Sequence, residues 1–147
     1  MTSRIDQRKE RARKAGTFDI YAIERDALLV GRLMGVLDAK TAEKIVEFVE
    51  TKEIVAEKGF NRLCDFTQLE GIHLSCDDLL QLAARRRAFN PNDIRVKSAF
   101  FATDPLAFGI ARMYEQMLNS PRIEVRVWSD LQAAADWLGV GLDRLLL

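Results

Sequence analysis

The sequence predicts an α/β fold: a single domain with a mostly parallel sheet, an antiparallel edge hairpin, and helices mainly on one face. Three observations lead to this fold class. Strand-like and helix-like segments alternate in the order β-β-α-β-α-β-α-β-α, which is typical of parallel strands joined by right-handed crossovers. The helical segments of the second half begin at residues that can cap a helix. The last two strands have polar side chains along one face only, which indicates a sheet that is not buried equally on both sides.

The first two strands form the predicted hairpin. Residues 18–24 (FDIYAIE) and 27–34 (ALLVGRLM) are rich in aliphatic and aromatic side chains. Arg25-Asp26 can form the turn between them. Gly31, inside the second strand, predicts a bulge or the close approach of another backbone, and Gly35 is expected to bound the strand.

The middle of the chain is predicted to contain a helix, a short strand and a loop. The helix spans about residues 38–57, has a polar face that includes Glu50, and stops at Gly59. The strand over residues 61–66 (NRLCDF) is apolar enough to be buried, so its cysteine is expected to be an inert thiol. Residues 67–74 are predicted to be a loop.

The second helix is predicted to run from Ser75 to Phe89. Ser75 and Asp78 have the spacing of a capping box, in which each residue bonds the backbone N–H of the other. The helix ends in three consecutive arginines, 85–87. Cations are favoured at a helix C-terminus, which explains the run without a ligand. The alternative is an anion-binding patch formed with the basic N-terminal segment and Arg95, Lys97, Arg122 and Arg126.

The last third of the chain contains the most regular pattern. A strand over residues 94–102 is followed by a helix from Asp104-Pro105 to about Asn119, a strand over 122–128, and a helix that opens at Ser129-Asp130 and stops at Gly139. In the 122–128 strand, three apolar residues alternate with three charged residues. We therefore expect helices mainly on one face of the sheet, with the other face solvated or covered by a partner.

Composition indicates an ordinary globular protein of 147 residues with a net charge of zero. Residues 1–16 are predicted to be a flexible basic arm with a net charge of +4, residues 17–140 to be the domain, and residues 141–147 to be an apolar tail. The tail could pack on its own domain, cover the open sheet face, or swap onto a second copy. The balanced charge argues against nucleic acid as a partner. Two cysteines and no apolar segment near 20 residues argue against a disulfide scaffold and a membrane span, so a cytoplasmic protein is expected.

The chain resembles the SpoIIAA-like (STAS-like) family of small bacterial proteins over about residues 18–140. The resemblance rests on a strand followed by a D-x-x-x-x-G-x-A-R-M-Y helix (104–114), a second strand, and a closing A-x-x-W-L helix (134–138). It implies a non-enzymatic binding or regulatory module that acts through a protein partner, with a possible homodimer.

In the phospho-switch relatives, a strand ends in an aspartate and a loop leads to a phosphorylated serine at a helix N-terminus. Asp65 matches the acid and Ser75 falls at the serine, but Leu74 and Cys76 depart from the relatives' Asp-Ser-(Ser/Thr)-Gly motif. A phosphate on Ser75 would gain from the helix N-terminus and be repelled by the adjacent acids. A plain helix cap is the simpler interpretation.

The candidate partner or ligand surface consists of Asp65, Thr67, Ser75, Asp104, Phe108 and Arg112. A buried stripe of Leu106, Ile110, Met113 and Met117 would leave Phe108 exposed beside Arg112. Gly109 predicts that a backbone or ligand comes close to this helix. The single histidine, His73, supplies no catalytic set and no metal site, so we expect no enzyme activity, metal or cofactor.

Two functions remain open at this point. The first is the interaction module that the resemblance implies. The second is a carrier or sensor of a small apolar ligand or lipid, held between sheet and helices near Met34, Phe66, Phe101 and Phe108. An interaction module can be fully packed, whereas a carrier needs an apolar cavity of roughly several hundred Å³.

Overall fold

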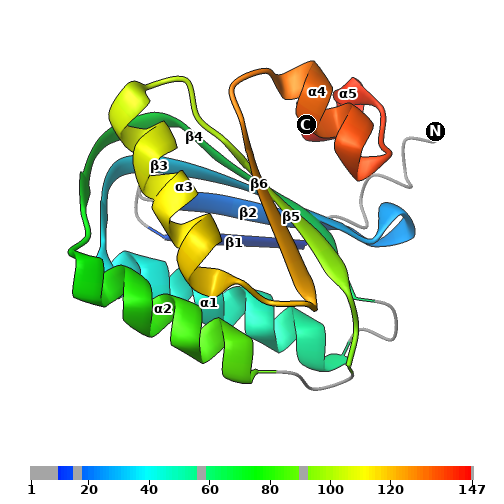
Figure 1. The fold of residues 1–147 in the computed structure, drawn as a ribbon. Coiled ribbons are helices and arrows are strands. Elements are labelled where there is room, and N and C mark those ends of the chain that lie inside the picture. Colours follow the sequence, from blue (N-terminus) through cyan, green and yellow to red (C-terminus); the bar gives the residue numbers. More distant parts are fainter. Residues whose placement is uncertain (1–9, 15–17, 56–58, 90–92, 147) are drawn as a thin grey trace.

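The computed structural model describes residues 10–14, 18–55, 59–89 and 93–146. Within these ranges the chain forms a six-stranded sheet in which the strands lie in sequence order (Figure 1). The β1–β2 and β2–β3 pairs are antiparallel, and the remaining three pairs are parallel. The strands are β1 Glu10–Lys14, β2 Phe18–Ile23, β3 Leu28–Asp38, β4 Asn61–His73, β5 Val96–Phe101 and β6 Ile123–Trp128. The α/β fold with a mostly parallel sheet is thus confirmed.

The N-terminal segment differs from the predicted flexible arm. Glu10–Lys14 form β1, which pairs with β2 over its whole length, from Glu10 opposite Ala22 to Lys14 opposite Phe18. The strand was missed because an edge strand needs only backbone pairing and no apolar pattern of its own. Residues 1–9 and 15–16 of the predicted arm lie outside the described residues.

Strands β3 and β4 are longer than their apolar patterns predicted. Gly35 has a φ of +69° and marks a shift in the β3–β4 register, after which pairing continues to Asp38 opposite His73. The predicted loop over residues 67–74 is therefore strand as far as His73. Backbone pairing with β3 extends β4 although this part of it is rich in exposed polar residues.

The long helices lie on one face of the sheet, as predicted. They are α1 Ala39–Val55, α2 Cys76–Ala88 and α3 Pro105–Leu118. The opposite face was expected to be solvated or covered by a partner, but the smaller α4 Leu131–Leu138 and α5 Leu142–Leu145 of the same chain lie on it (Figure 1). There they bury Tyr21, Val30 and Ala99 of the sheet.

The residues that were predicted to cap α3 and α4 do so in the structure. Asp104 accepts hydrogen bonds from the backbone N–H groups of Leu106 and Ala107, both at 3.1 Å. Asp130 accepts one from Ala133 at 3.3 Å. Gly139 ends α4 in the left-handed conformation with a φ of +76°.

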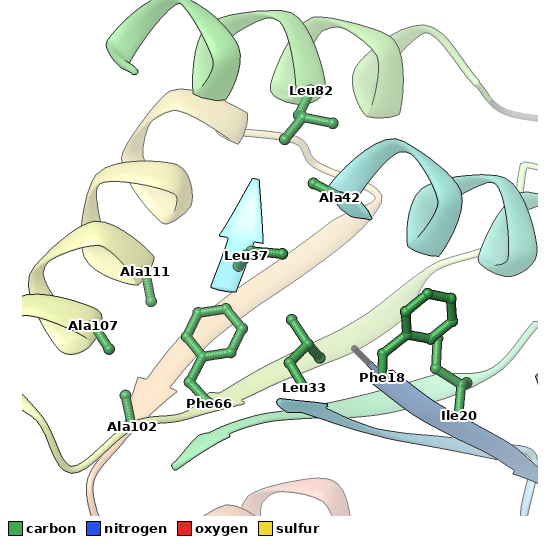
Figure 2. Packing of buried hydrophobic residues seen from close by; sticks show 10 residues of the cluster. All are labelled: Phe18, Ile20, Leu33, Leu37, Ala42, Phe66, Leu82, Ala102, Ala107 and Ala111. Carbon is green, nitrogen blue, oxygen red and sulfur yellow. The ribbon is translucent and has the colours of Figure 1, made fainter. Parts of the chain in front are cut away.

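The main core cluster lies between the sheet and α1–α3 (Figure 2). The helices contribute Leu82 of α2, Ala42 of α1 and Ala111 of α3 to this cluster. The sheet contributes Phe66 and Leu33. The helical residues closest to the sheet in α3 are alanines, Ala107 and Ala111, which are 5% and 1% exposed. Small side chains let this helix approach the sheet closely.

Candidate functional site

A cavity of about 150 Å³ lies within the main core, between the sheet and α1–α3. Most of its wall is apolar and comes from β2, β3 and the three long helices. The apolar lining includes Ile20, Leu33, Leu37, Ile45, Val46, Val49, Phe66, Leu79, Phe100 and Ile110. A ligand between the sheet and the helices was expected near Met34, Phe66, Phe101 and Phe108, and of these four residues Phe66 lines the cavity. The sequence could not place the cavity, because its volume depends on how side chains from eight elements pack together.

Small side chains in the wall help to leave this volume unfilled. Gly31, Ala42, Ser98 and Ala111 all line the cavity. Gly31 was expected to mark a bulge or a close backbone approach, and neither is found there. A Cβ built on Gly31 would meet Cγ1 of Ile20 at 3.4 Å and the Leu63 carbonyl oxygen at an ordinary van der Waals distance of 3.9 Å. The register shifts of β3 occur farther along the strand.

One part of the cavity wall is polar. Arg62, Arg86, Ser98 and Tyr114 line it, together with Cys64. The Tyr114 ring packs edge-on against Phe100, with ring centroids 5.8 Å apart. Burial raises the pKa of Tyr114, although the nearby arginines oppose the shift, so the phenol is neutral at pH 7. Burial, aided by the charge of Asp65, raises the pKa of the Cys64 thiol to about 12.

Behind this polar wall, two glutamates of α1 bind arginines of β4 and α2. Glu53 accepts hydrogen bonds from Arg62 at 2.9 Å and from Arg86 at 2.7 Å. Glu50 accepts from Arg86 at 3.2 Å and from Arg85 at 2.7 Å. Glu50 was predicted to belong to the polar face of its helix, but it is only 7% exposed because the arginines of α2 bind it.

The ion pairs fix the charge of Glu53. Burial alone would raise the pKa of Glu53, but hydrogen bonds from Arg86 and Arg62 and the charges of both arginines bring this pKa below its ordinary value. The carboxylate is therefore ionised at neutral pH. Burial lowers the pKa of Arg62, but a guanidinium stays protonated in this range.

The three arginines at the end of α2 each have a partner within the fold. Arg85 and Arg86 bind the glutamates of α1, and Arg87 donates to the carbonyls of Met117 and Leu118 at the end of α3. Arg122 donates to the carbonyls of Arg86 and Phe89 at the end of α2. The run therefore has partners without a ligand, but these partners are the glutamates of α1 and the end of α3 rather than the C-terminus of α2 that the sequence indicated.

The other cations of the alternative anion patch also have partners. Arg95 donates to the carbonyl of Pro121 and Lys97 to that of Trp137. Arg126 lies 3.8 Å from Glu124. Lys97 and Arg126 both lie over the Trp137 ring on the α4 face, whereas Arg86 lies on the opposite face of the sheet.

The six residues of the predicted surface do not form one linked site. Asp65 accepts hydrogen bonds from the Thr67 backbone N–H at 2.8 Å and hydroxyl at 2.6 Å. Asp104 caps α3, and Arg112 lies 3.7 Å from Glu115 of the same helix. Asp65 is opposite Phe101, the last residue of β5, in the β4–β5 register. It therefore lies near the end of β5 after which α3 starts. Within the described ranges, no hydrogen bond or ion pair joins Asp65 to Ser75, Asp104 or Arg112.

The prediction for Phe108 was wrong. Its side chain is half-buried and packs against the main core. Leu106 and Met113, assigned to the buried stripe, are 64% and 40% exposed. The alanines of α3 face the sheet. The buried face of the helix is therefore turned about the helix axis away from the predicted stripe of larger residues.

Gly109 also differs from its prediction, since no heavy atom lies within 4 Å of a Cβ built there. Gly109→Ala is therefore expected to raise the free energy of unfolding by about 0.5–1 kcal/mol, through better helix propensity. Urea denaturation measures this change. Gly139→Ala is the contrast: its surroundings are equally open but its φ is +76°, so a loss of about 1–2 kcal/mol is expected. A loss in Gly109→Ala would indicate an unseen neighbour.

Ser75 caps α2 as predicted. Its hydroxyl accepts from the Asp78 N–H at 3.0 Å, and the Asp78 carboxylate accepts from the Ser75 N–H at 2.9 Å. Ser75→Ala should lower the free energy of unfolding by about 0.5–2 kcal/mol, measured by thermal denaturation. Ser129→Ala is the control, because Asp130 and not Ser129 caps α4. Equal stability of the two variants would contradict the capping role.

Over the ranges that the structure describes, no group of three or more His, Cys, Asp or Glu residues is placed to hold a metal ion. No helix in the same ranges has both the length and the apolar character needed to cross a membrane.

Comparison with known proteins supports the fold and gives no function. No protein-family model matches the chain, and no curated protein matches it significantly. Among solved structures, it is similar to an uncharacterized protein from the DUF3478 family with a SpoIIAA-like fold, from Shewanella loihica PV-4. The two share 18% identity with a TM-score of 0.53, over 86% of this chain and 98% of that chain. The SpoIIAA-like fold expected from the resemblance is thus confirmed.

Proposed function

We propose that this chain is a non-enzymatic binding module that senses or carries a small apolar ligand in the cavity between the sheet and α1–α3. The observation that supports this function is the cavity itself. Apolar cavities inside a well-packed core are uncommon and destabilising, because their lining loses van der Waals contacts. A ligand in the cavity restores those contacts.

The volume sets the size of the ligand. Sites for drug-sized molecules occupy roughly 300–1,000 Å³. A cavity of about 150 Å³ matches the volume in which an engineered apolar core binds benzene. The ligand is therefore a single ring or a branched chain of similar size, and a long-chain lipid would require the helices to move apart.

Toluene is a suitable first probe. We expect saturable shifts of the backbone amide resonances of Ser98, Phe100 and Ala111, which line the cavity, in a two-dimensional NMR titration. Ala111→Leu should fill the cavity and abolish these shifts. Ala88→Leu adds the same volume at an exposed position of α2 and should leave them unchanged. Shifts that never saturate, or that spread over exposed residues, would contradict the proposal.

The interaction module implied by the resemblance is a second candidate. The observation in its favour is the exposure of Leu106 and Met113, which lie two turns apart on the outer face of α3. A homodimer through this face would dissociate in Leu106→Asp. Sedimentation velocity on both proteins tests this, and a monomeric wild-type protein would exclude the homodimer.

A further inference from the structure

The chemistry of the cavity wall narrows the class of ligand, if the proposed function holds. Each polar lining residue can donate a hydrogen bond: two guanidiniums, a serine hydroxyl, a neutral phenol and a thiol. None of the described residues that line the cavity has a carboxylate. The polar part of the wall therefore suits an acceptor and repels a cation.

The buried charges around this wall do not balance. Among the described residues, the charged side chains that are less than 10% exposed are two glutamates and three arginines, Glu50, Glu53, Arg62, Arg86 and Arg122. Arg122 does not line the cavity, and it interacts with the charge of Asp93. The excess lies in the ion-pair network behind the wall, where three arginines, Arg62, Arg86 and the partly exposed Arg85, bind two glutamates. A buried charge without a counter-charge is costly, so an anion near the wall would be favoured.

The wall also has donors that the protein does not use. Arg62 makes its hydrogen bonds through Nε and Nη2, to the Phe60 carbonyl and to Glu53. Over the described part of the chain, neither its Nη1 nor the hydroxyls of Ser98 and Tyr114 have a protein partner. Arg62 and Ser98 are only 9% and 6% exposed, and both line the cavity together with Tyr114.

These donors lie close together. Arg62 and Ser98 are directly opposite one another in the β4–β5 register, so their side chains are neighbours on the same face of the sheet. Tyr114 of α3 comes close enough to both Arg62 and Arg86 to interact with their charges. A guanidinium edge beside two hydroxyl groups is suited to the two oxygens of a carboxylate.

We infer that the ligand is a small apolar acid. Its carboxylate is held by Arg62, Ser98 and Tyr114, and its apolar body lies among the side chains of the main core. The acceptor completes the hydrogen bonds of the wall and neutralises the excess buried charge, and the apolar part fills the remaining volume.

Three probes of nearly equal shape test the inference: toluene, benzoate and benzamidinium, which are neutral, anionic and cationic at pH 7. Their dissociation constants are measured by NMR titration of the full chain. We expect benzoate to bind at least tenfold more tightly than toluene, and benzamidinium not to bind. Toluene binding without a benzoate preference would overturn the inference and leave the proposed function intact. No binding of either probe would overturn both.

Two variants locate the carboxylate without removing a buried charge. Ser98→Ala and Tyr114→Phe each remove one hydroxyl, and each should reduce the affinity for benzoate five- to tenfold with little change for toluene. Ser129→Ala is the control, since this serine is exposed and is not among the lining residues. An unchanged benzoate affinity in both cavity variants would place the anion elsewhere and refute the assigned site.

Discussion

Glu53→Gln is expected to lower the free energy of unfolding by about 3–5 kcal/mol, the usual loss when one partner of a buried ion pair is removed. Glu53 is 5% exposed and binds both Arg62 and Arg86. Glutamine keeps the shape of the side chain but removes the charge that compensates the two guanidiniums. Urea denaturation at pH 7 measures the difference.

The loss should depend on pH in a defined direction. The pKa of Glu53 in the folded protein lies below its ordinary value, so the ionised carboxylate stabilises the fold above the unfolded pKa of about 4.3. This contribution is lost as the pH falls from there through the folded pKa. The difference between wild type and Glu53→Gln should therefore be largest near neutral pH and narrow below about pH 4.

Glu47→Gln provides the matched control, because Glu47 lies on the exposed side of the same helix. Its effect should stay within about 0.5 kcal/mol, as for an ordinary surface substitution. If Glu53→Gln were as mild as this control at pH 7, the buried network would contribute little to stability. The excess positive charge assigned to the network behind the cavity wall would then also be in doubt.

The sequence predicted the fold well because each element has local information. Asp104 and Asp130 cap their helices as expected, and Gly139 ends α4 where its left-handed conformation requires a glycine. The errors occur where pairing across the sheet decides the structure. β1 and the far end of β4 are strands because their neighbours offer backbone partners, although their own side chains suggest a loop or an arm.

The candidate site was harder to predict, for a physical reason. Glu50 and Glu53 are three residues apart on α1, and Arg85 and Arg86 are adjacent on α2, so each pair alone resembles an ordinary charged helix surface. Only the packing of α1 against α2 and β4 turns them into a buried network. The sequence offered one clue: α1 and the end of α2 carry more charged residues than stabilisation of a helix terminus would require.

The C-terminal segment shows the same dependence on tertiary contacts. Of the three arrangements that the sequence left open, the structure has the tail packed on its own domain, on the face opposite α1–α3 (Figure 1). Arg32 donates a hydrogen bond to the Leu145 carbonyl, and Arg144 lies 2.7 Å from Asp26. Leu145 is 1% exposed, whereas its neighbour Leu146 is 62% exposed.

The difference in exposure between Leu145 and Leu146 allows a paired test of how the tail packs. Leu145→Ala should lower the free energy of unfolding by about 2–5 kcal/mol, as for other buried leucines. Leu146→Ala should change it by less than about 0.5 kcal/mol. Both are measured by urea denaturation at two protein concentrations.

The outcome shows whether the tail unfolds together with the domain or detaches from it independently. If α5 detached before the domain unfolded, the loss in Leu145→Ala would be limited to the small free energy of that local opening. If the tail were exchanged between two copies, the midpoint of denaturation would rise with protein concentration. A large loss that is independent of concentration is the result expected from α5 packed on its own sheet. It would mean that the face opposite the cavity is closed by the chain itself.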